Sequence, residues 1–238
     1  MRIFLAGAGG AIGRRLTPLL VKAGHAVTGT TRSAAKADDI AALNGMPVVV
    51  DVFDADALAA AVTKAAPEAV IHQLTDLAFA PGTPRYAEGL ARNARLRIEG
   101  TRNLAAAARA AGVRRLIAQS IAFIYAPGPG LRVEGDPLTG DPAMAGTVAG
   151  VRALEESVLA IPEGIVLRYG LFYGPGTWSP DGPLKPPAVH VDAAARACVL
   201  ALTRGQPGVY NVAEDDGYCA SDKAKRELGF DAGFRLTP

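Results

Sequence analysis

The sequence predicts an α/β fold built on a doubly wound parallel sheet with helices on both faces. Three observations predict it. Short apolar runs alternate with longer stretches rich in Ala and Leu. The connections between them are short, as in repeated strand–helix–strand units, whose crossovers are right-handed. The first apolar run ends at a cluster of glycines that opens a helix, which is typical of this class of sheet.

The first half of the chain supplies four expected strands and three expected helices. Residues 2–6 are an apolar run that stops at glycines, and residues 11–22 have apolar side chains at helical spacing before Gly24. Asp54 is expected to cap the third helix. The strands are expected at 2–6, 25–31, 47–50 and 69–74, and the helices at 11–22, 34–43 and 55–66.

The second half continues the same alternation as far as Gly170. A loop at 75–89 leads into a long helix at 90–111, and strands are expected at 115–119 and 165–169 on either side of a helix at 143–160. The stretch 174–187 is rich in Pro and Gly and is expected to be irregular. Beyond it we expect a helix at 191–203, a strand at 209–212 and a helix at 221–229.

The chain therefore divides into a Rossmann core at 1–170 and a small, reduced substrate-side lobe at 171–238, packed together as one structural domain. Core and lobe together number 238 residues.

Composition argues against several classes of partner. The formal net charge is +2, and Lys and Arg form no run longer than two, so no nucleic acid is expected to bind. No stretch approaches the ~20 apolar residues that span a bilayer, and no signal peptide is evident, so we expect a cytoplasmic protein without a membrane partner. Cys198 and Cys219 form no CxxC motif and no metal-binding spacing, so no metal site is expected.

The strongest motif is the glycine-rich turn at residues 7–13, GAGGAIG. Gly7 allows a tight turn, Gly10 lets a diphosphate approach the backbone, and Gly13 lets the helix pack closely on the sheet. Ala11 and Ile12 contribute N–H groups of the first helical turn, where an anion binds. The alternative is a glycine-rich turn without a ligand, but strand, glycines and helix all agree with a dinucleotide site.

The end of the second expected strand favours NADP over NAD. An NAD site normally carries an acidic residue there for the ribose hydroxyls. Here Thr31 and Arg32 occupy that region, and no acid appears before Asp38. The guanidinium of Arg32 suits a 2′-phosphate. The alternatives are a solvent-facing Arg32 and an NAD site.

Several motifs together resemble the extended short-chain dehydrogenase/reductases, in the NAD(P)-dependent epimerase/dehydratase branch whose members include nucleotide-sugar epimerases. Besides the glycine turn, they are VIHQLT at 70–75, IEGTRNL at 98–104, QSIAFIYAP at 119–127, LRYGLFYGPG at 167–176 and HVDAAARA at 190–197. The resemblance spans nearly the whole chain, although 183–186 and 216–219 look like places where family members carry extra helices.

The resemblance implies further cofactor contacts. Asp51 and Val52 would lie against the adenine, Leu74 and Thr75 would line the cofactor near its ribose, and Tyr173 would lie near the nicotinamide. For Asp51 the alternative is a helix cap. His72 lies inside an apolar strand and is interpreted as a core histidine.

The family's catalytic Tyr-x-x-x-Lys is absent, because no tyrosine of this chain has a lysine four residues later. The aligned tyrosine position is Thr147 or Val148, and the aligned lysine position is Val151 or Arg152. The family's Ser or Thr falls at Ile121, one residue after Ser120, and its usual Asn before Gly-Thr is Arg97.

Two functions of different classes remain open. The first is an NAD(P)-dependent oxidoreductase or epimerase acting on a small carbonyl, alcohol or nucleotide-sugar substrate, with Ser120, Tyr173 and Arg152 as candidate catalytic residues. The second is a non-catalytic NADP-binding regulator or redox sensor. A structural protein with a vestigial site is disfavoured by the intact glycine turn. In relatives the long helices, here 90–111 and 143–160, often pair across a homodimer.

Overall fold

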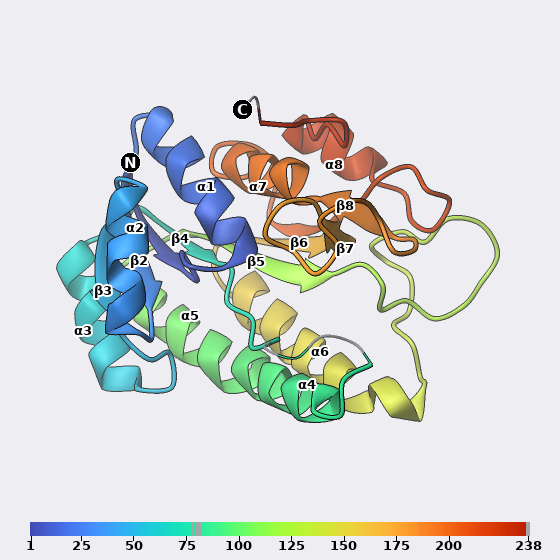
Figure 1. Cartoon of the computed structure of the whole chain (residues 1–238), viewed down its shortest axis with the longest axis horizontal. Coiled ribbons are helices and arrows are strands. Elements are labelled where there is room, and N and C mark those ends of the chain that lie inside the picture. The colour runs from blue at the N-terminus through green and yellow to red at the C-terminus, as the bar shows by residue number, and fades with distance from the viewer. Residues whose placement is uncertain (78, 80–81, 237–238) are drawn as a thin grey trace.

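A large parallel sheet lies between two layers of helices in the computed structural model of the chain (Figure 1). The structure describes all residues except 78, 80, 81, 237 and 238. Among them the sheet has seven strands in the order β3-β2-β1-β4-β5-β6-β9, which confirms the doubly wound Rossmann fold. The strands are β1 (Arg2–Ala6), β2 (Ala26–Thr31), β3 (Met46–Val49), β4 (Ala69–His72), β5 (Arg115–Ile121), β6 (Glu163–Tyr169) and β9 (Gly208–Val212).

Each central strand is buried on both faces, because its side chains alternate between two apolar cores. In β1, Ile3 and Leu5 point into one core, whereas Phe4 and Ala6 point into the other. Helices α1, α7 and α8 cover the first face, and α3, α5 and α6 cover the second (Figure 1). The bounds of these helices are α1 (Ala11–Lys22), α3 (Ala55–Ala65), α5 (Thr101–Ala110), α6 (Ala145–Leu159), α7 (Val191–Leu200) and α8 (Asp222–Leu228). A short helix, α2 (Ala37–Ala42), precedes β3.

The helix expected at 90–111 begins earlier than the sequence predicts and has a wide turn in its middle. It runs as α4 (Tyr86–Arg95), a π-helical turn η2 (Leu96–Gly100) and α5 (Thr101–Ala110). The wide turn lies against α6. Such turns often occur at functional sites, because they re-aim one or two side chains.

The residues after 170 do more than form a lobe. They add β9 to the main sheet, and α7 packs on α1, so they complete the Rossmann core. They also form a two-stranded parallel sheet of β7 (Leu171–Tyr173) and β8 (Ala188–His190), which the sequence did not reveal. The loop between these strands, 174–187, is irregular as expected.

Across the described part of the chain, no helix combines the length and the apolar character that crossing a membrane requires.

Candidate functional site

The glycine turn joins β1 to α1 at the point where the strand order reverses. Gly7 has a φ of +95°, and a Cβ there would lie 2.8 Å from the carbonyl oxygen of Gln73 at the end of β4. A Cβ on Gly13 would lie 2.5 Å from the carbonyl oxygen of Ala8. Both positions therefore require glycine, one for the turn and one for the close approach of α1 to the turn.

The first turn of α1 is left open to an anion. Its N-cap is Gly10, no side chain caps it, and no acidic residue lies in its first turn. The N–H groups of this turn, which include those of Ala11 and Ile12, have no partner inside the helix, and the helix dipole favours negative charge there. A diphosphate fits these donors.

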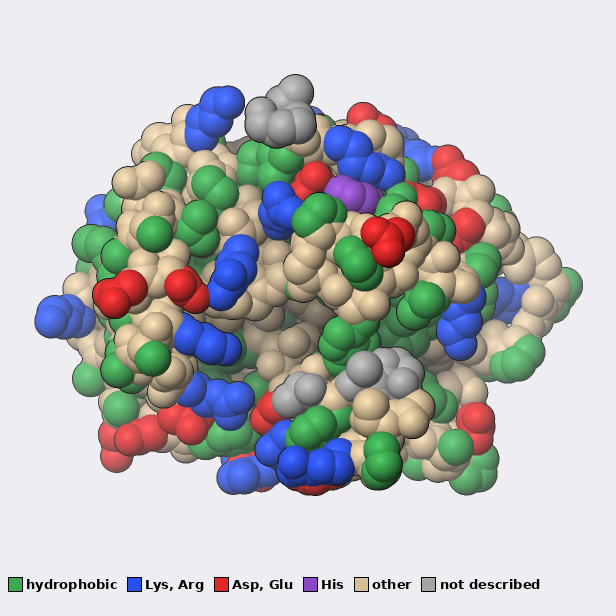
Figure 2. Space-filling view, in the orientation of Figure 1, with side chains coloured by type: hydrophobic (Ala, Val, Ile, Leu, Met, Phe, Trp, Pro, Cys, Tyr) green, Lys and Arg blue, Asp and Glu red, His purple; other side chains and the backbone are tan. Residues whose placement is uncertain are grey.

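A cavity of about 490 Å³ lies directly over this turn. Two segments far apart in the sequence form it, namely the start of α1 and the loop after β7. Its lining residues are Gly9, Ala11, Arg14, Arg15, Pro175 and Gly176. Figure 2 shows Lys and Arg side chains along one border of the hollow in the middle of this face, which suits a polyanionic ligand.

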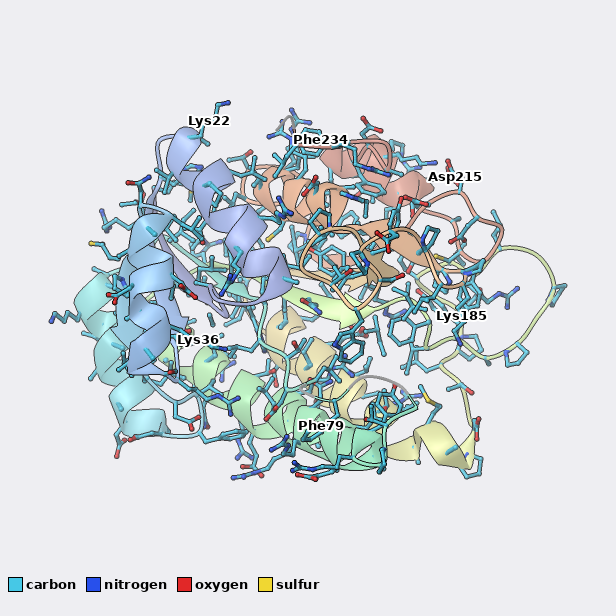
Figure 3. The ribbon with its side chains drawn as sticks, viewed as in Figure 1. Lys22, Lys36, Phe79, Lys185, Asp215 and Phe234 are labelled. Atoms are coloured by element: carbon cyan, nitrogen blue, oxygen red, sulfur yellow. The ribbon has the colours of Figure 1, made fainter. Side chains whose placement is uncertain are left out.

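The end of β2 carries the residues expected to select the cofactor. The side chain of Arg32 is 53% exposed, and its guanidinium lies 3.7 Å from a carboxylate oxygen of Asp76. The hydroxyl of Thr31 accepts a hydrogen bond from the N–H of Ser33 at 3.1 Å and so holds the loop. Figure 3 shows Lys36 beside the same border of the hollow. Arg32 is thus free enough to exchange its loose contact for a ligand's phosphate.

The remaining predicted cofactor residues lie at the ends of β3 and β4. Asp51 follows β3, is exposed, and accepts a hydrogen bond from the N–H of Phe53; the helix cap is Asp54. Val52 is buried against Gly100. Beyond β4, Leu74 is half-buried and Thr75 is exposed. All four therefore lie at the carboxyl edge of the sheet, and their contacts to a cofactor stay predictions.

The family's catalytic positions form an apolar patch in this chain. Ile121 and Val151 are both buried and pack in one cluster with Ile124, and Val148 lies against it. The resemblance places a hydroxyl at Ile121, a tyrosine at Thr147 or Val148, and a lysine four residues later at Val151 or Arg152. The side chains of Ile121, Val148 and Val151 themselves have no group that could hold or move a proton.

Ser120 lies just below this patch, inside a polar network. Its hydroxyl is fully buried and donates a hydrogen bond of 2.7 Å to Glu155 of α6. Glu155 also accepts two hydrogen bonds from Arg168 of β6, at 2.6 and 2.8 Å. Arg168 in turn donates to Tyr125, and burial raises the pKa of this tyrosine to about 12. The network joins β5, β6 and α6, and a catalytic role of Ser120 stays a prediction.

Arg152 and Tyr173 are the other two candidate catalytic residues. Arg152 is exposed on α6 and lines a separate open groove with residues 135–138. Tyr173 ends β7; its hydroxyl donates to Glu214 and accepts from Arg235 at 2.8 Å. Burial, followed by the bond to Glu214, raises the pKa of Tyr173 above its usual value, so the hydroxyl stays protonated at neutral pH.

Sequence reasoning missed two groups that shape the site. Arg15 lines the cavity and lies 3.6 Å from the buried carboxylate of Asp192. Glu155 organises the network around Ser120. Local sequence patterns could not predict the contact of Arg15 with Asp192 or that of Glu155 with Ser120, because each contact joins segments far apart in the chain. The position of Arg15 two residues after Gly13 was the one available signal.

A comparison with known proteins decides the family. The family model described as NAD(P)H-binding matches residues 7–159. The chain belongs to the NAD(P)H-binding family. This family member is also 41% identical to a 3-diazoavenalumate denitrifying reductase from a Streptomyces species, over 91% of this chain and 77% of that protein.

Solved structures of nucleotide-sugar epimerases share the fold of this chain. The UDP-glucose 4-epimerase of Thermotoga maritima, solved with UDP-glucose, has a TM-score of 0.77 at 20% identity, covering 99% of this chain and 94% of that one. The UDP-glucose 4-epimerase of Thermus thermophilus, solved with NAD, has a TM-score of 0.72 at 22% identity, covering 97% and 84%. At these identities the likeness concerns the fold. The protein is an NAD(P)-binding member with a reductase- and epimerase-like architecture.

Proposed function

We propose that this protein is an NADPH-dependent reductase that delivers hydride to an acceptor needing no proton from the enzyme. The observation that carries this proposal is the loss of the family's catalytic phenol: the aligned tyrosine position is Thr147 or Val148, and the aligned hydroxyl position is Ile121, which packs with Val151 in an apolar patch. Reduction of a carbonyl leaves an alkoxide that must be protonated, and this patch offers no donor. The proposal therefore assigns no proton-transfer role to Ser120, Arg152 or Tyr173.

A diazo group on an aromatic ring, in its arenediazonium form, is an acceptor of this kind. Bound NADPH would supply the hydride. The new C–H bond forms at the ring carbon while the C–N bond breaks, and N₂ leaves with that bonding pair. No proton is exchanged, so the step balances without an acid. The 41% identical relative is named as a denitrifying reductase of a diazo compound, which supports this substrate class.

In this proposal the chain's own residues bind and orient. The N–H groups at the start of α1 hold the diphosphate, and Arg32 holds the 2′-phosphate. The apolar patch keeps water from the hydride acceptor, since it presents no group that could hold a water molecule near the reacting carbon.

The direct test follows NADPH oxidation with benzenediazonium as the probe, above the rate without protein. We expect turnover that Ser120→Ala and Tyr173→Phe reduce by no more than about threefold, since neither hydroxyl moves a proton. Loss of most activity in either variant, with the fold intact, would assign the acid to that residue and overturn the proposal. Tight NADPH binding without turnover of any substrate would support the alternative of a non-catalytic regulator.

The preference for NADPH is tested separately. Arg32→Ala removes the charge at the end of β2, and we expect it to weaken NADPH binding about tenfold to a hundredfold, as for loss of a charge-assisted hydrogen bond, while NADH binding stays the same. Asp76→Asn is the matched variant: it frees Arg32 from its 3.7 Å ion pair and should leave NADPH binding unchanged or tighter. Tighter binding of NADH than NADPH by the unaltered protein would refute the assignment.

A further inference from the structure

Arg97 is a buried cation without a counter-ion. Its side chain belongs to the π-helical turn η2 and is only 5% exposed. Among the residues that the structure describes, none forms a hydrogen bond or an ion pair with its guanidinium. Burial lowers the pKa of Arg97 to about 10, so it stays charged at neutral pH. A charge in such a place is costly unless something pairs with it.

The neighbouring ionisable groups do not pair with Arg97. The negative charge of Glu155 acts on Arg97 and raises its pKa, but both carboxylate oxygens of Glu155 already accept hydrogen bonds from Arg168 and Ser120. His72 is fully buried, and burial lowers its pKa to about 4, so it is neutral. Among the described residues, Arg97 therefore has no charged partner.

The position of Arg97 connects it to the candidate site. On α6, a Cβ at Gly150 would lie 3.4 Å from the Cβ of Arg97, so η2 and α6 touch at this point. The next residue along α6 is Val151, which belongs to the apolar patch with Ile121. Arg97 therefore approaches, from a different helix, the place where the family resemblance puts a cationic side chain.

The guanidinium is also reachable. In the described part of the chain, three side-chain polar atoms are both inaccessible to solvent and without a hydrogen-bond partner. They belong to Gln73, Arg92 and Asp192. The nitrogens of Arg97 are not among them, although they too lack a partner, so they retain some contact with solvent. Since an unpaired buried charge is costly, an anion that pairs with this guanidinium would be bound favourably.

We propose that Arg97 binds the carboxylate of an aromatic acid substrate. One buried positive charge matches one planar monoanion, whose two oxygens suit the guanidinium fork. On α6, Val148 is only partly buried beside the apolar patch and suits an aromatic ring next to that carboxylate. This inference rests on the proposed function in taking the apolar patch as the place where the substrate binds.

The test uses benzoate and benzamide, which have nearly the same shape, differ in charge and are not reduced. Binding of each to the NADPH-loaded protein is measured by calorimetry. We expect benzoate to bind at least about tenfold tighter than benzamide. Arg97→Met should abolish this preference, and Arg97→Lys should keep part of it. Arg102→Met, an exposed arginine on α5, is the matched control and should change nothing.

Thermal unfolding separates a binding role from a structural one. If Arg97 is held unpaired for a ligand, Arg97→Met removes a buried charge and should raise the Tm of the ligand-free protein by ~2–4 °C. A lower Tm, or a benzoate preference that survives in Arg97→Met, would overturn the proposal. Tighter binding of inorganic phosphate than of benzoate would overturn the carboxylate assignment. Since neither probe is reduced, these results do not depend on turnover of a diazonium substrate.

Discussion

The backbone carbonyl oxygens of Gly7 and Ala8 face Gly13 so closely that any side chain there would push α1 away from the turn. The glycine spacing in the sequence predicted this contact, because the need for glycine is local. The partners of Ser120 and Arg97 could not be predicted in the same way. Their surroundings are set by α6, which follows Ser120 by 25 residues or more and comes about 50 residues after Arg97.

Gly13→Ala should damage the turn and the cofactor site together. The added Cβ would overlap two backbone oxygens, so we expect a loss of about 1–3 kcal/mol in the free energy of unfolding and weaker NADPH binding. Gly146→Ala in α6 is the matched control, because a Cβ there meets nothing within 4 Å. It should be neutral or slightly stabilising. Urea denaturation and NADPH titration of both variants measure the two effects, and equal behaviour of the two would contradict this account of the turn.

His72 should make the protein less stable in mild acid. The N–H of Leu74 donates to Nδ1, so the proton is on Nε2 and is donated to Thr101 at 2.8 Å. Burial lowers the pKa of His72 in the folded protein to about 4, whereas the usual pKa of histidine is 6.5. The unfolded chain therefore binds a proton first as the pH falls, and stability is lost from about pH 6.5 down to about pH 4, by roughly 3 kcal/mol.

Urea denaturation across this pH range tests the role of His72. In His72→Gln this part of the pH dependence should disappear. If the variant shows the same slope as the unaltered protein, the acid sensitivity comes from another group.

At the scale of elements, most strands and helices followed from periodicity and from their glycine and proline boundaries. Two features did not. The π-helical turn at 96–100 contains no proline and no pair of glycines that would predict it from the sequence. It lies where the helix packs against α6, which is a long-range contact. The pairing of β7 with β8 joins strands separated by a Pro- and Gly-rich loop, and a three-residue strand carries too little pattern to be detected.

The ion pair between Glu155 and Arg168 connects α6 to β6. Both side chains are at most 10% exposed. Glu155→Gln would leave Arg168 buried without its counter-ion, and we expect a loss of about 3–5 kcal/mol in the free energy of unfolding. Glu88→Gln breaks an exposed pair with Arg85 and should cause no measurable change. Chemical denaturation of both variants measures this difference, and a mild effect of Glu155→Gln would show that the network is not needed to hold α6.

At the scale of the whole molecule, the sheet brings the glycine turn beside a loop that lies about 160 residues later in the chain; Arg15 and the carbonyl of Pro175 span that separation. The sequence predicted the glycine turn at the start of α1, because the strand–glycine–helix pattern depends on local residues alone. It could not identify a catalytic proton donor, since the family's tyrosine position is Thr147 or Val148 and its lysine position is Val151 or Arg152. The central claim is that hydride passes there without a proton donor.

The most direct measurement of that claim is the source of the new hydrogen in the product. The protein is given benzenediazonium with NADPH that carries deuterium at the transferable position, and the benzene formed is analysed by mass spectrometry. We predict one deuterium on the product from labelled NADPH in ordinary water, and none from ordinary NADPH in D₂O. A product that takes its hydrogen from the solvent would contradict direct hydride transfer at this site.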